Sequence, residues 1–179
     1  MSMRPAVFLD RDGVLNRIVI QNGLPVGPLE LREFALVNGA AEDVRRLKNA
    51  DYIVIVVTNQ PELASGRLDA NVLKAMHVKL RAEIPVDAIY VCPHDDTKRC
   101  SCRKPLPGLL LSAARDYDID LKHSFMVGDR WRDVEAGKAA GCRTILIEMG
   151  YSEKLHSPPD WSVTSLTTAV ETILSVNYR

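Results

Sequence analysis

The sequence predicts an α/β fold in which one doubly wound, parallel sheet carries helices on both faces. Apolar runs rich in β-branched residues, such as YIVIVV at 52–57, have the composition of buried parallel strands. These runs alternate with segments whose apolar residues recur at helical spacing. Several runs end in acidic or hydroxyl side chains, which is typical of sheets that bind ligands beyond the carboxyl ends of their strands.

The expected elements alternate regularly along the chain. Strands are expected at residues 6–9, 52–57, 86–91, 124–127 and 143–148. Helical periodicity covers residues 40–47, 72–80, 110–117, 131–140 and 166–174. Asp69 is an expected N-cap, Pro107 an expected first helical residue and Gly141 an expected left-handed C-cap. Residues 16–33 are expected to form a loop.

Length, charge and cysteine content restrict the class of protein. A chain of 179 residues fits one domain, 1–179, and its 23 basic and 23 acidic residues cancel, which argues against a nucleic-acid or membrane partner. The N-terminus lacks the apolar segment of a signal peptide, so we expect a cytoplasmic protein that acts on a small molecule. In that compartment the 4 cysteines are expected to be metal ligands, nucleophiles or core residues.

Two carboxylates, Asp10 and Asp12, follow the first expected strand in the stretch VFLDRDG. A buried strand has no structural use for acidic side chains at its end, so these side chains point to chemistry. Gly13 allows the backbone to turn sharply and to approach a ligand closely. Solvated turn residues are the alternative interpretation of such a pair.

Further polar residues follow the other expected strands. Thr58 and Asn59 follow the second, Asp129 follows the fourth, and Lys104 lies past the third in CRKPLPG. Each has a structural alternative: a turn cap, a solvated lysine, or an N-cap with Asp133 as a first-turn acid. Because the carboxyl ends of parallel strands meet at one edge, we expect these residues to share one phosphate and metal site.

A phosphate monoester is the substrate class that these residues suit. Asp10 is the predicted nucleophile, which would form an aspartyl phosphate, and Asp12 is the predicted general acid/base. Lys104 and the Thr58 hydroxyl are predicted to stabilise the phosphoryl oxygens.

Mg²⁺ is the predicted cofactor, because an anionic nucleophile can approach a dianionic ester only when cations offset the repulsion. Its expected ligands are Asp10, the main-chain carbonyl of Asp12, and Asp129. Asp133 is expected to orient Asp129 or a metal-bound water.

Four further residues have the spacing of a zinc site. Cys92, His94, Cys100 and Cys102 form a CxHx5CxC array, and three thiolates with one imidazole are a typical tetrahedral set for structural Zn²⁺. A redox pair at Cys100 and Cys102, or unrelated thiols, are the alternatives. Cys142 is interpreted as a small core residue.

The motifs together resemble those of the haloacid dehalogenase superfamily of phosphohydrolases: DRDGV, VVTN, CRKP and GDRWRD. The segment CPH…CxCRKPxPG is similar to the zinc loop of the D-glycero-D-manno-heptose 1,7-bisphosphate 7-phosphatases, and the likeness covers residues 5–175. The resemblance implies removal of the 7-phosphate of that sugar, Arg103 as a substrate contact, and a monomer in the pathway that supplies heptose for surface polysaccharides. Only short inserts separate the first two motifs, so no separate cap domain is expected.

Some segments depart from this family pattern. PELASG follows TNQ, Arg130 stands where lysine is common, and residues 16–33 lack the usual GYxH stretch. Arg130 and the zinc loop also occur in histidinol-phosphate phosphatase domains, so that activity, or hydrolysis of another small sugar phosphate, remains an alternative. A non-catalytic phosphate-binding module is the alternative from another class. The expected substrate contacts are Asn59, Gln60, Arg103 and Arg130.

Overall fold

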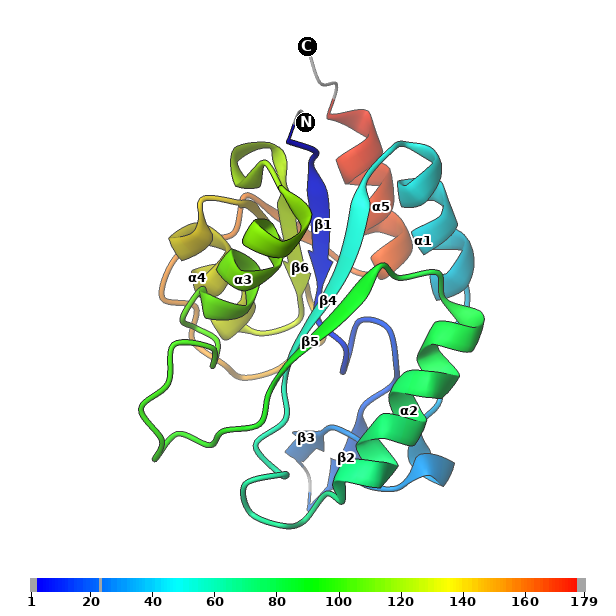
Figure 1. The fold of residues 1–179 in the computed structure, drawn as a ribbon, viewed down its shortest axis with the longest axis vertical. Helices are drawn as coiled ribbons and strands as arrows, with labels where there is room; N and C mark the ends of the chain where they lie inside the picture. Colours follow the sequence, from blue (N-terminus) through cyan, green and yellow to red (C-terminus); the bar gives the residue numbers. More distant parts are fainter. Residues whose placement is uncertain (1–2, 23, 177–179) are drawn as a thin grey trace.

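A six-stranded parallel sheet forms the centre of the molecule (Figure 1). The structure is a computed structural model that describes residues 3–22 and 24–176. The strand order is β5-β4-β1-β6-β7-β8, so the chain reverses its direction of growth at β1. A reversal of this kind leaves a crevice at the carboxyl ends of the strands on either side of it. The strands are β1 (Ala6–Leu9), β4 (Ile53–Asn59), β5 (Ala88–Cys92), β6 (Phe125–Gly128), β7 (Arg143–Ile147) and β8 (Trp161–Val163).

Helices cover both faces of the sheet, as the sequence predicts for a doubly wound fold (Figure 1). One face carries α1 (Ala40–Asn49), α2 (Ala70–Glu83) and α5 (Leu166–Ser175), and the other carries α3 (Gly108–Tyr117) and α4 (Trp131–Ala140). Two short 3-10 helices, η1 (Leu31–Glu33) and η2 (Leu121–His123), lie in the connections. None of the helices in the described part of the chain is long and apolar enough to cross a membrane.

The sheet separates two apolar cores, and β1 contributes to both. Val7 and Leu9 pack with the first face, whereas Ala6 and Phe8 pack with the second, and all of them are buried. This distribution follows from the alternation of side chains along a strand. The buried strand therefore holds its carboxyl end, where Asp10 begins, in a fixed position.

The predicted helix ends agree with the structure at two of three positions. Asp69 caps α2 by accepting hydrogen bonds from the amides of Asn71 and Val72, and Gly141 ends α4 with φ of 86°. Pro107 differs, because it is the N-cap residue and α3 begins at Gly108. The Gly108 amide donates to the carbonyl oxygen of Ser101, which ties the start of the helix to the preceding loop.

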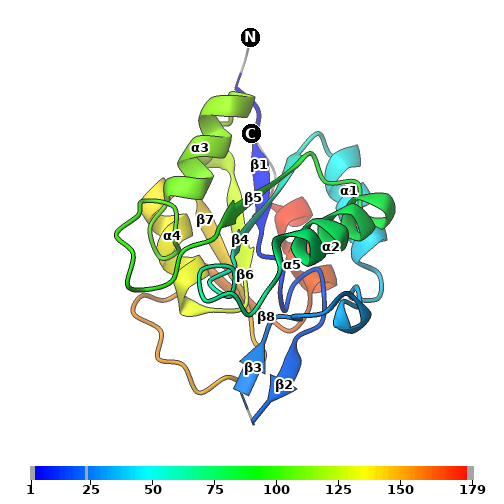
Figure 2. The same ribbon diagram turned by 60° about the horizontal axis from the view of Figure 1, so that its bottom comes forward.

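Several short elements were not expected from the sequence. The predicted loop at 16–33 contains an antiparallel hairpin of β2 (Val19–Gln21) and β3 (Leu24–Val26), followed by η1, and β8 adds a sixth strand at the sheet edge. Each of these strands has three residues, which is too short for an alternating pattern to be recognised. The hairpin projects beyond the carboxyl ends of the central strands, where Figure 2 brings it forward.

Candidate active site

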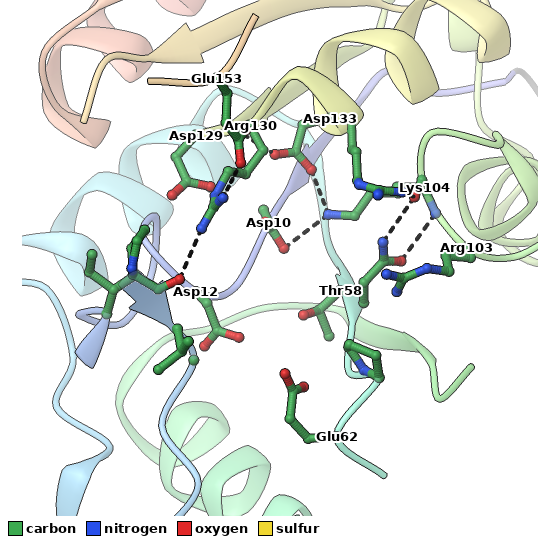
Figure 3. Close-up of a pocket in the computed structure, with 17 residues that line it drawn as sticks. Asp10, Asp12, Thr58, Glu62, Arg103, Lys104, Asp129, Arg130, Asp133 and Glu153 are labelled. Atoms are coloured by element: carbon green, nitrogen blue, oxygen red, sulfur yellow. Dashed lines mark hydrogen bonds and ion pairs between the residues drawn. The ribbon is translucent and has the colours of Figure 1, made fainter. Parts of the chain in front are cut away.

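A cavity of about 280 Å³ lies at the carboxyl ends of the central strands. Figure 3 shows side chains from several connections that point into it. Those predicted from the sequence are Asp10, Asp12, Thr58, Asn59, Arg103, Lys104, Asp129, Arg130 and Asp133. Glu62, Arg132 and Glu153 also line the cavity and were not anticipated: Glu62 and Glu153 lie outside every motif, and Arg132 lies within GDRWRD but was given no role there. The predicted convergence on one crevice is therefore confirmed in its geometry.

Lys104 is the most constrained side chain of the cavity. Only 2% of it is exposed, and its Nζ lies 3.0 Å from Asp10 Oδ1, 2.6 Å from Asp133 Oδ1 and 2.9 Å from the carbonyl oxygen of Val57. These contacts use all three donors of an ammonium group. Although burial lowers the pKa of Lys104, Asp10 and Asp133 raise it above its usual value, so the ammonium remains charged.

The main chain around Lys104 is fixed by Asn59 at the end of β4. The Asn59 side chain donates to the Lys104 carbonyl oxygen at 3.0 Å and accepts from the Lys104 amide at 3.1 Å. This reciprocal pair attaches the segment after β5 to the neighbouring strand. Asn59 therefore positions Lys104, in addition to lining the cavity.

Three buried carboxylates lie together beside this ammonium. Oxygen atoms of Asp10, Asp129 and Asp133 lie within 4.8 Å of one another. Burial raises the pKa of Asp10 to about 7, with Asp133 and Asp12 adding to the effect and Lys104 opposing it. Burial, followed by repulsion from Asp10 and Asp133, raises the pKa of Asp129 to about 8. The single positive charge of the Lys104 ammonium therefore does not balance the negative charge that three ionised carboxylates would carry.

Glycine makes the close approach of these carboxylates possible. Gly13 has φ of 83°, and a Cβ atom there would lie 2.2 Å from Asp129 Oδ2. A Cβ atom at Gly128 would lie 2.2 Å from the Cβ of Asp133. Neither position tolerates a larger residue without displacement of an acidic side chain, and the sharp backbone turn predicted at Gly13 is present.

The donor set fits a hard divalent cation. Oδ1 of Asp129 is buried and has no hydrogen-bond partner in the described part of the chain. The cavity is lined by six acidic and four basic residues, so without a cation its charge would repel a phosphate. Carboxylate oxygens in this arrangement are the ligands that Mg²⁺ prefers.

The side chains of Thr58 and Gln60 contact each other at the end of β4. The Thr58 hydroxyl donates to Gln60 Oε1 at 3.1 Å, and both residues are buried. Thr58 lines the cavity, whereas Gln60 stands behind it and is not part of the cavity wall as described. Gln60 is thus placed to orient the Thr58 hydroxyl, and its direct contact with a substrate stays a prediction.

The two predicted arginines occupy opposite parts of the cavity (Figure 3). Arg130 forms an ion pair with Glu153, donates to the carbonyl oxygen of Pro25 on β3 at 3.2 Å, and stacks its guanidinium 4.3 Å from the Tyr151 ring. It thereby ties the hairpin to the segment after β7. Arg103 pairs with Asp96 at 2.8 Å and lies next to the cysteine-rich loop.

The cysteine-rich loop brings its four predicted ligands together. The Cys92 sulfur lies 3.7 Å from His94 Nδ1 and 3.8 Å from the Cys100 sulfur, and the Cys102 sulfur lies 3.4 Å from His94 Nδ1 and 3.0 Å from that of Cys92. Tetrahedral coordination with Zn–S bonds of about 2.3 Å requires sulfur atoms about 3.8 Å apart, so most of these distances fit zinc. No disulfide joins these residues.

Comparisons with known proteins agree with the motifs. A family model described as HAD-hydrolase-like matches residues 101–169. The D-glycero-beta-D-manno-heptose-1,7-bisphosphate 7-phosphatase of Bordetella bronchiseptica is 39% identical over 83% of this chain and 83% of its own length. The D-glycero-D-manno-heptose-1,7-bisphosphate 7-phosphatase of Thermosynechococcus vestitus is 35% identical over 95% of each chain.

A solved structure extends the agreement to the fold. The crystal structure of the D,D-heptose 1,7-bisphosphate phosphatase from B. bronchiseptica, complexed with magnesium and phosphate, has a TM-score of 0.83 and 34% identity. The alignment covers 97% of this chain and 99% of the other. The chain therefore belongs to the D-glycero-D-manno-heptose-1,7-bisphosphate 7-phosphatase family of HAD-like phosphatases.

Proposed function

We propose that the protein is a Mg²⁺-dependent phosphomonoester hydrolase that removes the 7-phosphate of D-glycero-D-manno-heptose 1,7-bisphosphate. The main support is the Lys104 ammonium held between Asp10 and Asp133 in a cavity that also contains Asp12 and Asp129. This is the charge arrangement that transfer of a phosphoryl group requires. The sugar is inferred from the substrate after which the relatives are named.

The proposed reaction has two steps, both at Asp10. A carboxylate oxygen of Asp10 bonds to phosphorus while the ester bond to the sugar oxygen breaks, and Asp12 gives its proton to that oxygen. A water molecule then bonds to phosphorus and loses its proton to Asp12. The bond between Asp10 and phosphorus breaks, which releases inorganic phosphate and restores both carboxyl groups to their starting states.

The other residues bind and orient the phosphoryl group. Lys104 stabilises the negative charge on its oxygens, and Thr58 donates a hydrogen bond after its hydroxyl rotates away from Gln60. Arg103 is the proposed contact for the distal part of the substrate. Arg130, which joins the hairpin to Glu153, shapes the side of the cavity where the sugar leaves.

Asp10, the main-chain carbonyl of Asp12, and Asp129 are the proposed Mg²⁺ ligands, with Asp133 orienting them through its position next to Lys104. Bound Mg²⁺ supplies positive charge that offsets the repulsion between the carboxylates and the phosphoryl oxygens.

We further propose that Cys92, His94, Cys100 and Cys102 hold one structural Zn²⁺ ion that fixes the loop carrying Arg103. We also propose that residues 1–179 form a single phosphatase domain. We infer a cytoplasmic monomer whose partner is a small phosphorylated sugar, in keeping with four free cysteines.

The nucleophile assignment predicts the effect of Asp10→Asn. An amide is a very poor nucleophile, so we expect Mg²⁺-dependent phosphate release to fall by at least about 10³-fold with the fold retained. The matched control is Asp118→Asn, an exposed C-cap residue with φ of 51° at which asparagine is well tolerated. Normal turnover by Asp10→Asn would end the assignment. Values of kcat/KM for both anomers of the heptose bisphosphate and for histidinol phosphate then decide the substrate.

A further inference from the structure

We propose that Arg11, anchored by His77, is the positioning residue that orients the carboxyl group of Asp12 for proton transfer. The inference rests on the proposed function, because it concerns how the acid/base is held. Neither residue was singled out by the sequence. Arg11 lies between two carboxylates in the chain, and His77 is 66 residues away on α2.

Arg11 donates hydrogen bonds to both oxygens of the Asp12 carboxylate. Its Nη2 lies 2.9 Å from Oδ1 and 3.0 Å from Oδ2, and its Nε lies 3.1 Å from Oδ1. A fork of this kind fixes the plane of a carboxylate as well as its position. Asn16 adds a donor to Oδ1 at 2.9 Å.

Arg11 is itself held from the opposite side. Its Nη1 lies 3.2 Å from His77 Nε2, and its guanidinium carbon lies 5.6 Å from the centre of the Phe34 ring. Because guanidinium can only donate, His77 Nε2 must be the acceptor and therefore unprotonated. Burial, followed by the charge of Arg11, lowers the pKa of His77 to about 4 and keeps the imidazole neutral.

The burial pattern separates positioning from direct participation. The Arg11 side chain is fully buried and is not among the residues that line the cavity. The Asp12 side chain is 17% exposed and lines the cavity. A substrate in the cavity would thus contact Asp12, and Arg11 would affect turnover only through Asp12. A charged pair with one partner fully buried and the other largely so gains little stability, which argues that the pair serves the orientation of Asp12.

Leaving-group chemistry gives a test that a purely structural role would not satisfy. The oxygen of an alkyl ester, such as the heptose 7-phosphate, needs a proton as it departs, whereas p-nitrophenolate does not. A displaced Asp12 should therefore slow ester cleavage of the sugar phosphate. It should leave the burst of p-nitrophenolate from p-nitrophenyl phosphate nearly unchanged, since that burst reports only the attack of Asp10.

The test compares variants at both positions with Asp12→Asn as the reference for complete loss of proton transfer. For Arg11→Lys and His77→Leu we expect kcat on the heptose bisphosphate to fall about tenfold to a hundredfold, with KM little changed. The p-nitrophenolate burst rate should change by less than about threefold. His77→Gln, whose amide oxygen can accept the bond from Arg11, should restore most of the activity. Val78→Ala, an exposed neighbour on α2, is the control.

Two outcomes would overturn the proposal: equal losses on both substrates, or no loss on either. If Arg11→Lys fails to fold, the pair His77→Leu and His77→Gln decides the question, because His77 lies outside the cavity. The proposed function has its own test: normal activity of Asp10→Asn would contradict it, whatever the Arg11 and His77 variants do. An inactive Asp10→Asn with unaffected Arg11 and His77 variants would refute only the positioning role.

Discussion

The buried carboxyl groups are the main source of unfavourable free energy at this site. Asp10 and Asp129 have pKa values raised to about 7 and about 8, chiefly by burial, and Asp133 adds repulsion to both. In water these groups would ionise freely near pH 4. Their clustering is therefore unfavourable in the absence of a cation, which is the expected trade of stability for function at a catalytic centre.

This trade predicts the behaviour of Asp129→Asn. At neutral pH and without Mg²⁺ the variant should be more stable than the wild type, because burial and the neighbouring Asp10 and Asp133 make ionisation of Asp129 unfavourable only in the folded state. We expect its Tm to rise by about 3 °C, which corresponds to about 1 kcal/mol for a chain of this length. Thermal unfolding with and without Mg²⁺ tests this. The wild type should gain stability on Mg²⁺ addition, and the variant should gain none and be inactive.

A variant that still gained stability from Mg²⁺ would place the ion away from Asp129. Glu171→Gln on α5 is a suitable control, since this exposed acidic residue lies outside the cavity. Its response to Mg²⁺ should equal that of the wild type.

The residues proposed to carry the chemistry were predictable from the sequence, whereas the residues that hold them in place were not. Asp10, Asp12 and Asp129 stand at strand ends, where side chains of this type have no structural use. Arg11 and His77 have no such signal, because their contact depends on how α2 docks against the sheet. The position of Gln60 behind Thr58 likewise depends on the course of the chain after β4.

Among the helices and strands, the length of an element determines whether its sequence pattern can be recognised. The central strands β1 and β4 and the helices were predicted because their apolar patterns are long or nearly continuous. The hairpin β2–β3 and strand β8 have three residues each, and Pro25 stands within β3. A short strand that contains proline at a sheet edge lacks the signals that identify a strand.

The zinc ion proposed for the cysteine-rich loop makes this loop the element whose stability is expected to depend on a metal. Elemental analysis should find about one zinc per chain, and Cys100→Ser should lose most of it. Because the loop carries Arg103 and leads to Lys104, loss of zinc should lower kcat/KM. The sheet and its helices should melt at nearly the same temperature, since their apolar cores are otherwise intact.

Cys142→Ala is the matched control for the zinc prediction. Cys142 is buried outside the ligand cluster, so this variant should keep its zinc and its activity. Iron in place of zinc, or full zinc content in Cys100→Ser, would contradict the assignment.

For the whole molecule, the topology explains why residues far apart in the chain meet. Parallel strands on both sides of the reversal at β1 direct their carboxyl ends to one edge of the sheet. Asp10 follows β1, Thr58 is the second-last residue of β4, and Asp129 follows β6. This convergence was predictable because it follows from the α/β pattern alone. The wall made by the hairpin, Arg130 and Glu153 was not, because it depends on loop conformation.

The most direct test of this account is to map the phosphoryl group on the protein during turnover. Wild-type enzyme is mixed with the heptose bisphosphate and Mg²⁺, quenched in acid within the first turnover, and digested for mass spectrometry. We expect phosphate on the peptide that contains Asp10, present only with Mg²⁺ and lost when the substrate is exhausted. Rapid turnover without protein-bound phosphate, or phosphate on a different residue, would contradict the account.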